Sequence, residues 1–132
     1  MSLKNQKTTA DFLDWNENIS LIHRLSRDGY YKLSLFVSLG TFLGLRASDL
    51  LSLKWEDVLN KDEIHLREKK TGKERVLKIN SDLKKLIDEA HKSIKPQFEP
   101  VFTNKRGGIM SIQYINRKLK ELKFIYKLDI EN

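Results

Sequence analysis

The chain has 132 residues, a formal net charge of +7 and no cysteine. This length fits one domain with its own hydrophobic core, and the absence of thiols excludes disulfides, thiolate metal sites and cysteine nucleophiles. The longest apolar run, residues 33–45, is too short and too rich in hydroxyl groups to cross a bilayer, so we expect a cytoplasmic protein with no membrane partner.

Helices dominate the first half of the predicted fold. Residues 1–10 are polar and are expected to form a disordered or tag-derived tail, which leaves a single domain over 11–132. Apolar side chains recur every three or four positions from there to Arg27, and Gly29 favours a helix end. Residues 31–43 predict a second helix that is apolar on most of its circumference.

Arg46 lies where this helix is expected to break, at Gly44, and where a short third helix over 47–53 begins. Apolar neighbours on both sides predict that the stem of Arg46 is enclosed, so its charge needs an anionic partner. Two partners fit the sequence. Asp49, one helical turn on, would give an internal ion pair, which spacing alone favours, whereas an external phosphate would be held by the guanidinium fork at the helix break.

From Glu63 the apolar period changes to two, which predicts a β-hairpin. The tip of this hairpin carries the basic sequence Lys-Lys-Thr-Gly-Lys over residues 69–73. Ile64 and Leu66 are expected to face inward, and Val76, Leu77 and Ile79 are the apolar residues of the second strand.

The rest of the chain predicts two more helices and one more strand. A helix capped by Asn80 or the serine after it ends before the next proline, with His91 at the surface near its end. Residues 101–102 are expected to be a third strand, and a helix from Ser111 to about Leu122 precedes a tail without a closing element. The expected fold is therefore α+β but mainly α, with helices packed around a small antiparallel sheet of about three strands.

The positive charge is unevenly placed along the chain. Residues 1–62 hold eight basic and eight acidic side chains, whereas residues 63–132 hold seventeen basic and ten acidic ones. An excess confined to one half indicates a polyanionic partner, most often nucleic acid. A solvated lysine-rich surface is the ordinary alternative.

Several classes of chemistry lack the residues that they need. The sequence has no Gly-rich phosphate loop, no metal-ligand spacing among its histidines and no second carboxylate cluster beside residues 56–57, so we expect no metal and no cofactor. Arg46 and Lys70 remain as a chemical pair. An arginine holds nonbridging phosphate oxygens as negative charge builds, and a lysine protonates a leaving alkoxide, so the two suit metal-free attack on a phosphodiester.

Three segments carry a family resemblance. Residues 44–50 (Gly-Leu-Arg-Ala-Ser-Asp-Leu), 53–58 (Leu-Lys-Trp-Glu-Asp-Val) and 70–75 (Lys-Thr-Gly-Lys-Glu-Arg) occur in this order with a strand before the last. Together they resemble the first half of the catalytic domain of the tyrosine recombinase, or phage integrase, family. The resemblance covers residues from about 21 to 122. It depends on the order of these segments along the chain, since the segment around Arg46 or the one around Lys70 would be weak evidence alone.

This resemblance implies roles for individual residues. Arg46 matches the first of the family's two catalytic arginines, which bind the scissile phosphate. Lys70 matches the hairpin lysine implicated as general acid for the 5′-hydroxyl leaving group, with Lys69 and Lys73 as close competitors. Asp49 stands where the family more often has glutamate, and it is expected to support the helix beneath Arg46.

The resemblance also implies an activity and its limits. In this family a tyrosine attacks DNA, giving a 3′-phosphotyrosine and a free 5′-hydroxyl without metal or nucleotide cofactor, and the intact enzymes act as tetramers in the integration and recombination of phage and other mobile elements. The His-x-x-Arg box with the second arginine is missing from this sequence, and Tyr114 and Tyr126 lie in the wrong context for the nucleophile. Without the C-terminal half of the catalytic domain as its partner, the chain is expected to be inactive.

Binding to double-stranded DNA is nevertheless expected. The family's separate N-terminal DNA-clamping domain has no counterpart here, so binding should be mostly independent of sequence and dependent on salt. Besides Lys70, the side chains expected to contact phosphates are Lys69, Lys73, Arg75, Lys105, Arg106, Arg117 and Lys118. Two alternatives stay open: a noncatalytic DNA-binding module or mobile-element remnant, and a helical interaction domain whose basic half is only solvated.

Overall fold

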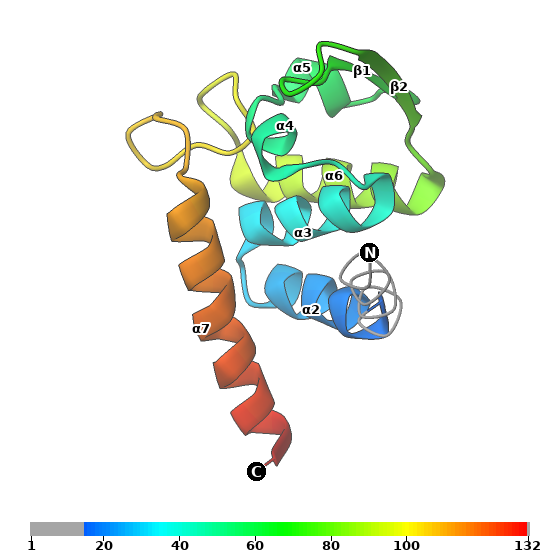
Figure 1. Cartoon of the computed structure of the whole chain (residues 1–132). Coiled ribbons are helices and arrows are strands. Elements are labelled where there is room, and N and C mark those ends of the chain that lie inside the picture. The colour runs from blue at the N-terminus through cyan, green and yellow to red at the C-terminus, as the bar shows by residue number, and fades with distance from the viewer. Residues whose placement is uncertain (1–14, 132) are drawn as a thin grey trace.

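The computed structural model describes residues 15–131, with side chains as far as Lys127. The predicted tail over 1–10 and the start of the first predicted helix lie outside the described residues. Figure 1 shows stacked helices with a small hairpin at one end and one long helix along the side. In chain order the elements are α2 (Trp15–Arg27), α3 (Tyr31–Leu43), α4 (Ala47–Leu51), α5 (Trp55–Val58), β1 (Glu63–Arg67), β2 (Glu74–Lys78), α6 (Ser81–Ile94) and α7 (Ile112–Glu131).

Glycines end α2 and α3, as predicted. The N–H of Tyr30 donates to the carbonyl of Leu25 at 2.8 Å across Gly29, whose φ is 89°. Gly44 has a φ of 65°, and its N–H donates to the carbonyl of Gly40 at 3.0 Å. Glycine adopts this left-handed conformation without steric cost, so both helix ends are set locally. The predicted third helix is shorter than expected and is followed by α5, which the periodicity does not predict.

The core has two parts that share α3. The larger cluster joins α3, α4, α5, β1, α6 and residues 101–102, and it holds the hairpin against the body of the domain. Asn80 caps α6, as predicted, by accepting the N–H of Leu83 at 2.8 Å. The smaller cluster joins α2, α3 and α7 through side chains such as Leu25 and Ile115. This second cluster fixes α7 beside α2 and α3 (Figure 1).

In the described part of the chain the sheet has two strands, not three. β1 and β2 pair antiparallel with Ile64 opposite Leu77. Residues 101–102 are fully buried, but they are flanked only by single bridges, and the Val101 N–H donates to the carbonyl of Leu53 at 3.0 Å. Two consecutive buried apolar residues give the same sequence pattern as a short buried strand. The pattern therefore could not distinguish the two, and the prediction of a third strand is wrong. Ile64 is buried, as predicted, whereas Val76 lies on the outer face of the hairpin at 56% exposure, opposite His65.

Two other predictions also need correction. Ser111 caps α7, as expected, but the helix continues past Leu122 to the end of the described chain. Tyr126 lies one turn after Leu122 and extends the same buried face, so no tail separates from the helix. His91 lies in the last turn of α6, as predicted, but it is half-buried and not fully at the surface, because its ring packs edge-to-face on Trp55 with 5.1 Å between centroids. None of the described helices is both long enough and apolar enough to span a membrane.

Candidate nucleic-acid interface

Arg46 occupies the N-cap position of α4 and points away from the core. Its backbone is extended, with φ −74° and ψ 156°. Gly44 turns the chain, Leu45 takes the buried position, and the next side chain, Arg46, is therefore exposed. The prediction of an enclosed stem is wrong, because apolar neighbours in sequence do not become neighbours in space at this bend.

Asp49 does not pair with Arg46. No ion pair of Arg46 with a carboxylate is found within the described residues, so the internal pair that spacing favours is not formed. Asp49 is only 2% exposed, and its Oδ1 accepts the backbone N–H of Lys69 at 3.3 Å. This contact ties α4 to the hairpin tip and brings two distant parts of the sequence together.

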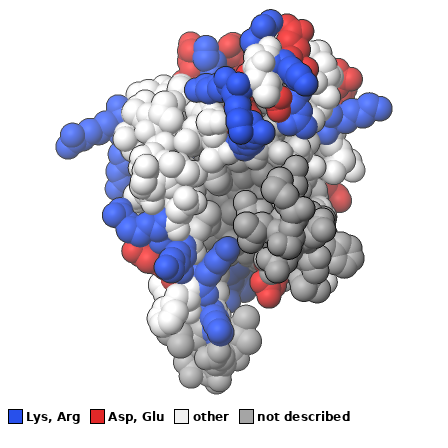
Figure 2. All heavy atoms as spheres, viewed as in Figure 1, with Lys and Arg blue, Asp and Glu red and all other residues white. Residues whose placement is uncertain are grey.

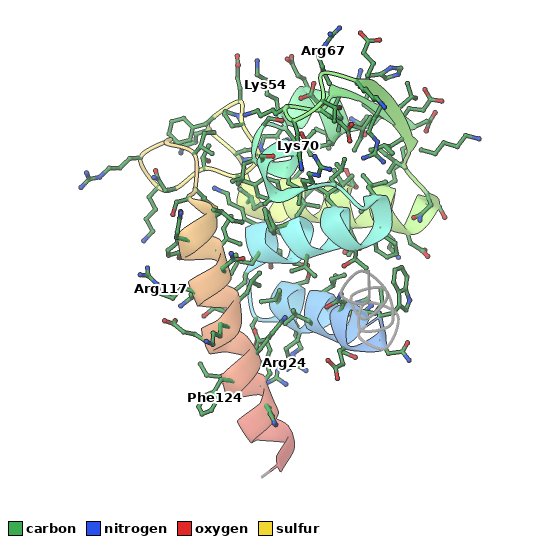
Figure 3. The ribbon with its side chains drawn as sticks, viewed as in Figure 1. Arg24, Lys54, Arg67, Lys70, Arg117 and Phe124 are labelled. Atoms are coloured by element: carbon green, nitrogen blue, oxygen red, sulfur yellow. The ribbon has the colours of Figure 1, made fainter. Side chains whose placement is uncertain are left out.

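The hairpin tip is a closed turn that presents lysines. The Glu68 N–H donates to the carbonyl of Lys73 at 2.9 Å, and the Gly72 N–H donates to the carbonyl of Glu68 at 2.8 Å. Gly72 has a φ of 73°, which suits glycine. Lys69, Lys70 and Lys73 are all exposed, and Figure 3 shows Lys70 on the side of the hairpin that meets α4, whereas Arg67 points away from the body.

Glu68 is a member of this site that the sequence does not reveal. Its carboxylate accepts the hydroxyl of Thr71 at 2.8 Å and pairs with Arg75 Nη1 at 3.3 Å. The hydrogen bond from Thr71, aided by the charges of Arg75 and Arg46, lowers the pKa of Glu68 against the opposing effect of burial. An acidic residue that opens a basic turn is the one signal in the sequence that points to it.

Arg75 is less available than predicted. It lies on the inner face of the hairpin opposite Leu66, and its side chain is 33% exposed in its pair with Glu68. Arg67, by contrast, pairs with Glu74 at 2.8 Å on the solvent side, where both side chains are largely exposed. The structure therefore groups Arg46 with the tip lysines and places Arg75 behind them as a half-buried ion pair.

The other predicted contacts lie on other elements. Lys105 and Arg106 are exposed in a loop whose turn is closed by Asn104, which accepts the N–H of Arg106 at 2.9 Å. On α7, Arg117 lies over the ring of Tyr114 at 5.8 Å. Lys118, on the same helix, lies 5.7 Å from the centroid of the Tyr30 ring. Figure 2 shows Lys and Arg on several separate parts of this face, with Asp and Glu among them, and not as one continuous patch.

Tyr126 is held in a manner unsuited to a nucleophile. Its side chain is buried between α7 and α2, and the guanidinium of Arg24 lies 4.4 Å from its ring centroid. Burial first, and then the neighbouring Asp28 carboxylate, raise the pKa of the Tyr126 hydroxyl to about 12. A hydroxyl attacks phosphorus readily only when its proton is easily removed, and this environment has the opposite effect. Among the described residues no cluster of His, Asp or Glu is placed to hold a metal ion.

Comparison with known proteins identifies the family. The sequence model of a family described as "Phage integrase family" matches residues 11–131. No curated protein matches the chain.

Two solved structures share its fold. One is a lambda integrase (75–356) dimer bound to a COC′ core site, with a TM-score of 0.58 and 19% identity over 81% of this chain and 40% of that chain. The other is a lambda integrase tetramer bound to a Holliday junction, with a TM-score of 0.56 and 19% identity over 78% of this chain and 32% of that chain. This chain therefore spans less than half the length of either.

Proposed function

The chain belongs to the phage integrase family of tyrosine recombinases, and we propose that it is the DNA-binding part of a site-specific recombinase that acts in DNA integration and recombination. The observation that carries this proposal is the contact between Asp49 and the backbone of Lys69, because it joins α4, whose N-cap Arg46 is exposed and has no ion pair among residues 15–127, to a lysine-bearing turn. Two cationic groups on different elements thus share one edge of the domain. A DNA backbone is a partner that such an edge fits.

In the proposed mechanism Arg46 and Lys70 have different tasks. The guanidinium of Arg46 would hold two nonbridging oxygens of the scissile phosphate, where negative charge grows as the phosphorus is attacked. Lys70 would give its proton to the departing 5′-oxygen, so that a hydroxyl leaves in place of an alkoxide. Lys69 and Lys73 would hold flanking phosphates. These steps need no metal or nucleotide cofactor, because the protein supplies both the cation and the proton.

The nucleophile would come from outside this chain. The sequence contains no His-x-x-Arg segment, and Tyr126 is buried with a raised pKa, so the chain alone should bind DNA without cleaving it. The groups that complete the reaction would belong to the C-terminal half of the catalytic domain, whose tyrosine forms the 3′-phosphotyrosine. By analogy with the lambda integrase tetramer bound to a Holliday junction, the intact enzyme would act on DNA as a tetramer. We propose that it acts in the cytoplasm.

More distant basic residues would add affinity without adding specificity. Lys105, Arg106, Arg117 and Lys118 lie on the loop after α6 and on α7, away from the hairpin in the chain. Each would contribute through phosphate contacts that weaken as salt rises. The affinity of the chain for a duplex should therefore fall steeply between about 50 mM and about 200 mM salt.

Duplex binding by fluorescence anisotropy tests the proposal. Arg46→Ala should weaken binding about five- to tenfold, because it removes a charge-assisted arginine–phosphate contact. Arg67→Ala is the matched control: it also removes one arginine charge, but from the outer face of the hairpin, where Arg67 is already paired with Glu74. It should change the Kd less than about twofold. If both variants behaved alike, the chain would be a noncatalytic DNA-binding module, and no binding at either salt concentration would favour a helical interaction domain.

The catalytic roles need a longer chain that carries the C-terminal half. On a suicide substrate, Arg46→Ala and Lys70→Ala should each abolish most of the covalent protein–DNA adduct. Unchanged adduct formation in both variants would refute the assignment of these roles. Testing Lys69→Ala and Lys73→Ala in the same assay would identify which tip lysine donates the proton.

A further inference from the structure

The carboxylate of Glu68 lies in the middle of the proposed phosphate site. Its side chain is only 16% exposed, and it pairs with Arg75 at 3.3 Å. The residue that follows it, Lys69, is held through its backbone N–H by Asp49 of α4, the short helix that has Arg46 at its N-cap. It accepts the hydroxyl of Thr71, which lies inside the turn next to Lys70, and it bonds to Arg75 on β2. A negative charge at this place opposes the entry of a phosphate, so its presence needs a reason.

The need to neutralise Arg75 does not by itself explain why the Glu68 carboxylate is turned inward. Arg67 faces Glu74 across the same hairpin in an exposed pair at 2.8 Å, which shows that the two strands can pair an arginine at the surface. Glu68 differs because its carboxylate is 16% exposed and lies at the point where Asp49 ties the turn to α4, next to the helix N-cap that Arg46 occupies. The positive charge of Arg46 also helps to lower the pKa of Glu68. Glu68 already has two direct partners, whereas Arg46 has no ion pair within the described residues.

We infer that the carboxylate of Glu68 is an internal substitute for a DNA phosphate: it holds the lysine-bearing turn in shape in the free protein and competes with phosphate for the positive charge of Arg46. This inference rests on the proposed function. Glu68 is thus a positioning residue, not a catalytic one. It orders the site before DNA arrives and lowers the affinity for phosphates that do not fill the site completely.

Duplex binding by Glu68→Gln tests the competition. Glutamine keeps the length of the side chain and an oxygen that can accept from Thr71, but it removes the charge. Its Kd should be about fivefold lower than that of the unmutated chain at low salt, and the difference should shrink as salt rises. Glu74→Gln adds the same net charge on the outer face, where Glu74 is 76% exposed, and should change the Kd by less than about twofold.

A double-mutant cycle separates competition from a purely structural role. If Glu68 offsets part of the charge of Arg46, Arg46→Ala should weaken binding more in the Glu68→Gln background than in the unmutated chain. Equal effects in both backgrounds, or a Glu68→Gln affinity no higher than that of Glu74→Gln, would overturn the inference while leaving the proposed function intact. Absence of duplex binding by the unmutated chain would instead refute the proposed function.

A measurement on the unmutated chain covers the case in which Glu68→Gln fails to fold. In an NMR titration with duplex, the side-chain Nε–H signals of Arg46 and Arg75 should both move, because a phosphate at Arg46 also disturbs the carboxylate that Arg75 holds. The Arg67 signal serves as the control and should stay in place. Movement of Arg46 without Arg75 would overturn the inference.

Discussion

Replacing Asp49 with alanine should release the hairpin tip from α4. Asp49 is 2% exposed, and its Oδ1 accepts the N–H of Lys69 at 3.3 Å. Alanine removes the acceptor, so the tip loses this tie to α4. The tip lysines would then lose their fixed position relative to Arg46.

The size of the effect follows from the geometry of this contact. A hydrogen bond to a charged acceptor contributes about 1.5–3 kcal/mol, and the distance of 3.3 Å places this one at the low end. Lys69 is exposed, so water can reach its N–H after the substitution, which lowers the cost further. We expect Asp49→Ala to lower the free energy of unfolding by about 1–2 kcal/mol, which corresponds to a fall in Tm of roughly 4–8 °C for a chain of this size.

Thermal unfolding combined with amide hydrogen exchange checks this expectation. Exchange over residues 68–73 should speed up in Asp49→Ala, and less so in Asp49→Asn, which keeps an acceptor oxygen. Asp57→Ala is the control, because Asp57 accepts the N–H of Lys54 at 2.9 Å and caps α5 without touching the hairpin tip. It should lower the Tm similarly but leave exchange at the tip unchanged. The reasoning would be refuted if Asp49→Ala left tip exchange unchanged, or if Asp57→Ala accelerated it equally.

Two further predictions concern Tyr126 and Gly107. The pKa of Tyr126 is raised from 10.0 to about 12, so the contribution of the neutral hydroxyl to the free energy of unfolding is complete below pH 10 and is lost as the pH rises through about 12. An ultraviolet titration should show a late tyrosinate phase that Tyr126→Phe lacks. A Tyr126→Phe titration curve with the same late phase would contradict this. Gly107 has a φ of 93°, and a Cβ there would lie 2.7 Å from the Phe98 ring. By urea unfolding, Gly107→Ala should cost about 1 kcal/mol more than Gly72→Ala, which meets strain but no neighbour; equal costs would mean that Phe98 moves aside freely.

Features that depend on a few consecutive residues could be predicted from the sequence. The ends of α2 and α3 follow from Gly29 and Gly44, and the start of α6 follows from Asn80, because left-handed glycines and side-chain caps act within one turn of the backbone. The hairpin and its lysine tip follow from the alternation of apolar residues on either side of a Gly-containing turn.

Features that depend on which surfaces meet could not be predicted in this way. Residues 101–102 are buried without joining the sheet, because their hydrogen bonds go to Leu53 and Met110. α7 continues past its expected end because Tyr126 packs against side chains of α2. The burial of an apolar residue is visible in its chemistry, but the element that covers it is not.

The candidate site divides in the same way. The sequence by itself determined that Arg46 stands at a helix break and that three lysines crowd a tight turn, since both depend on local backbone geometry. Only the tertiary structure decided that Arg46 is exposed and unpaired within the described chain, that Asp49 reaches the backbone of the turn, and that Glu68 faces inward between arginines. Hydrogen bonds and charge pairs across elements depend on distances that packing alone sets.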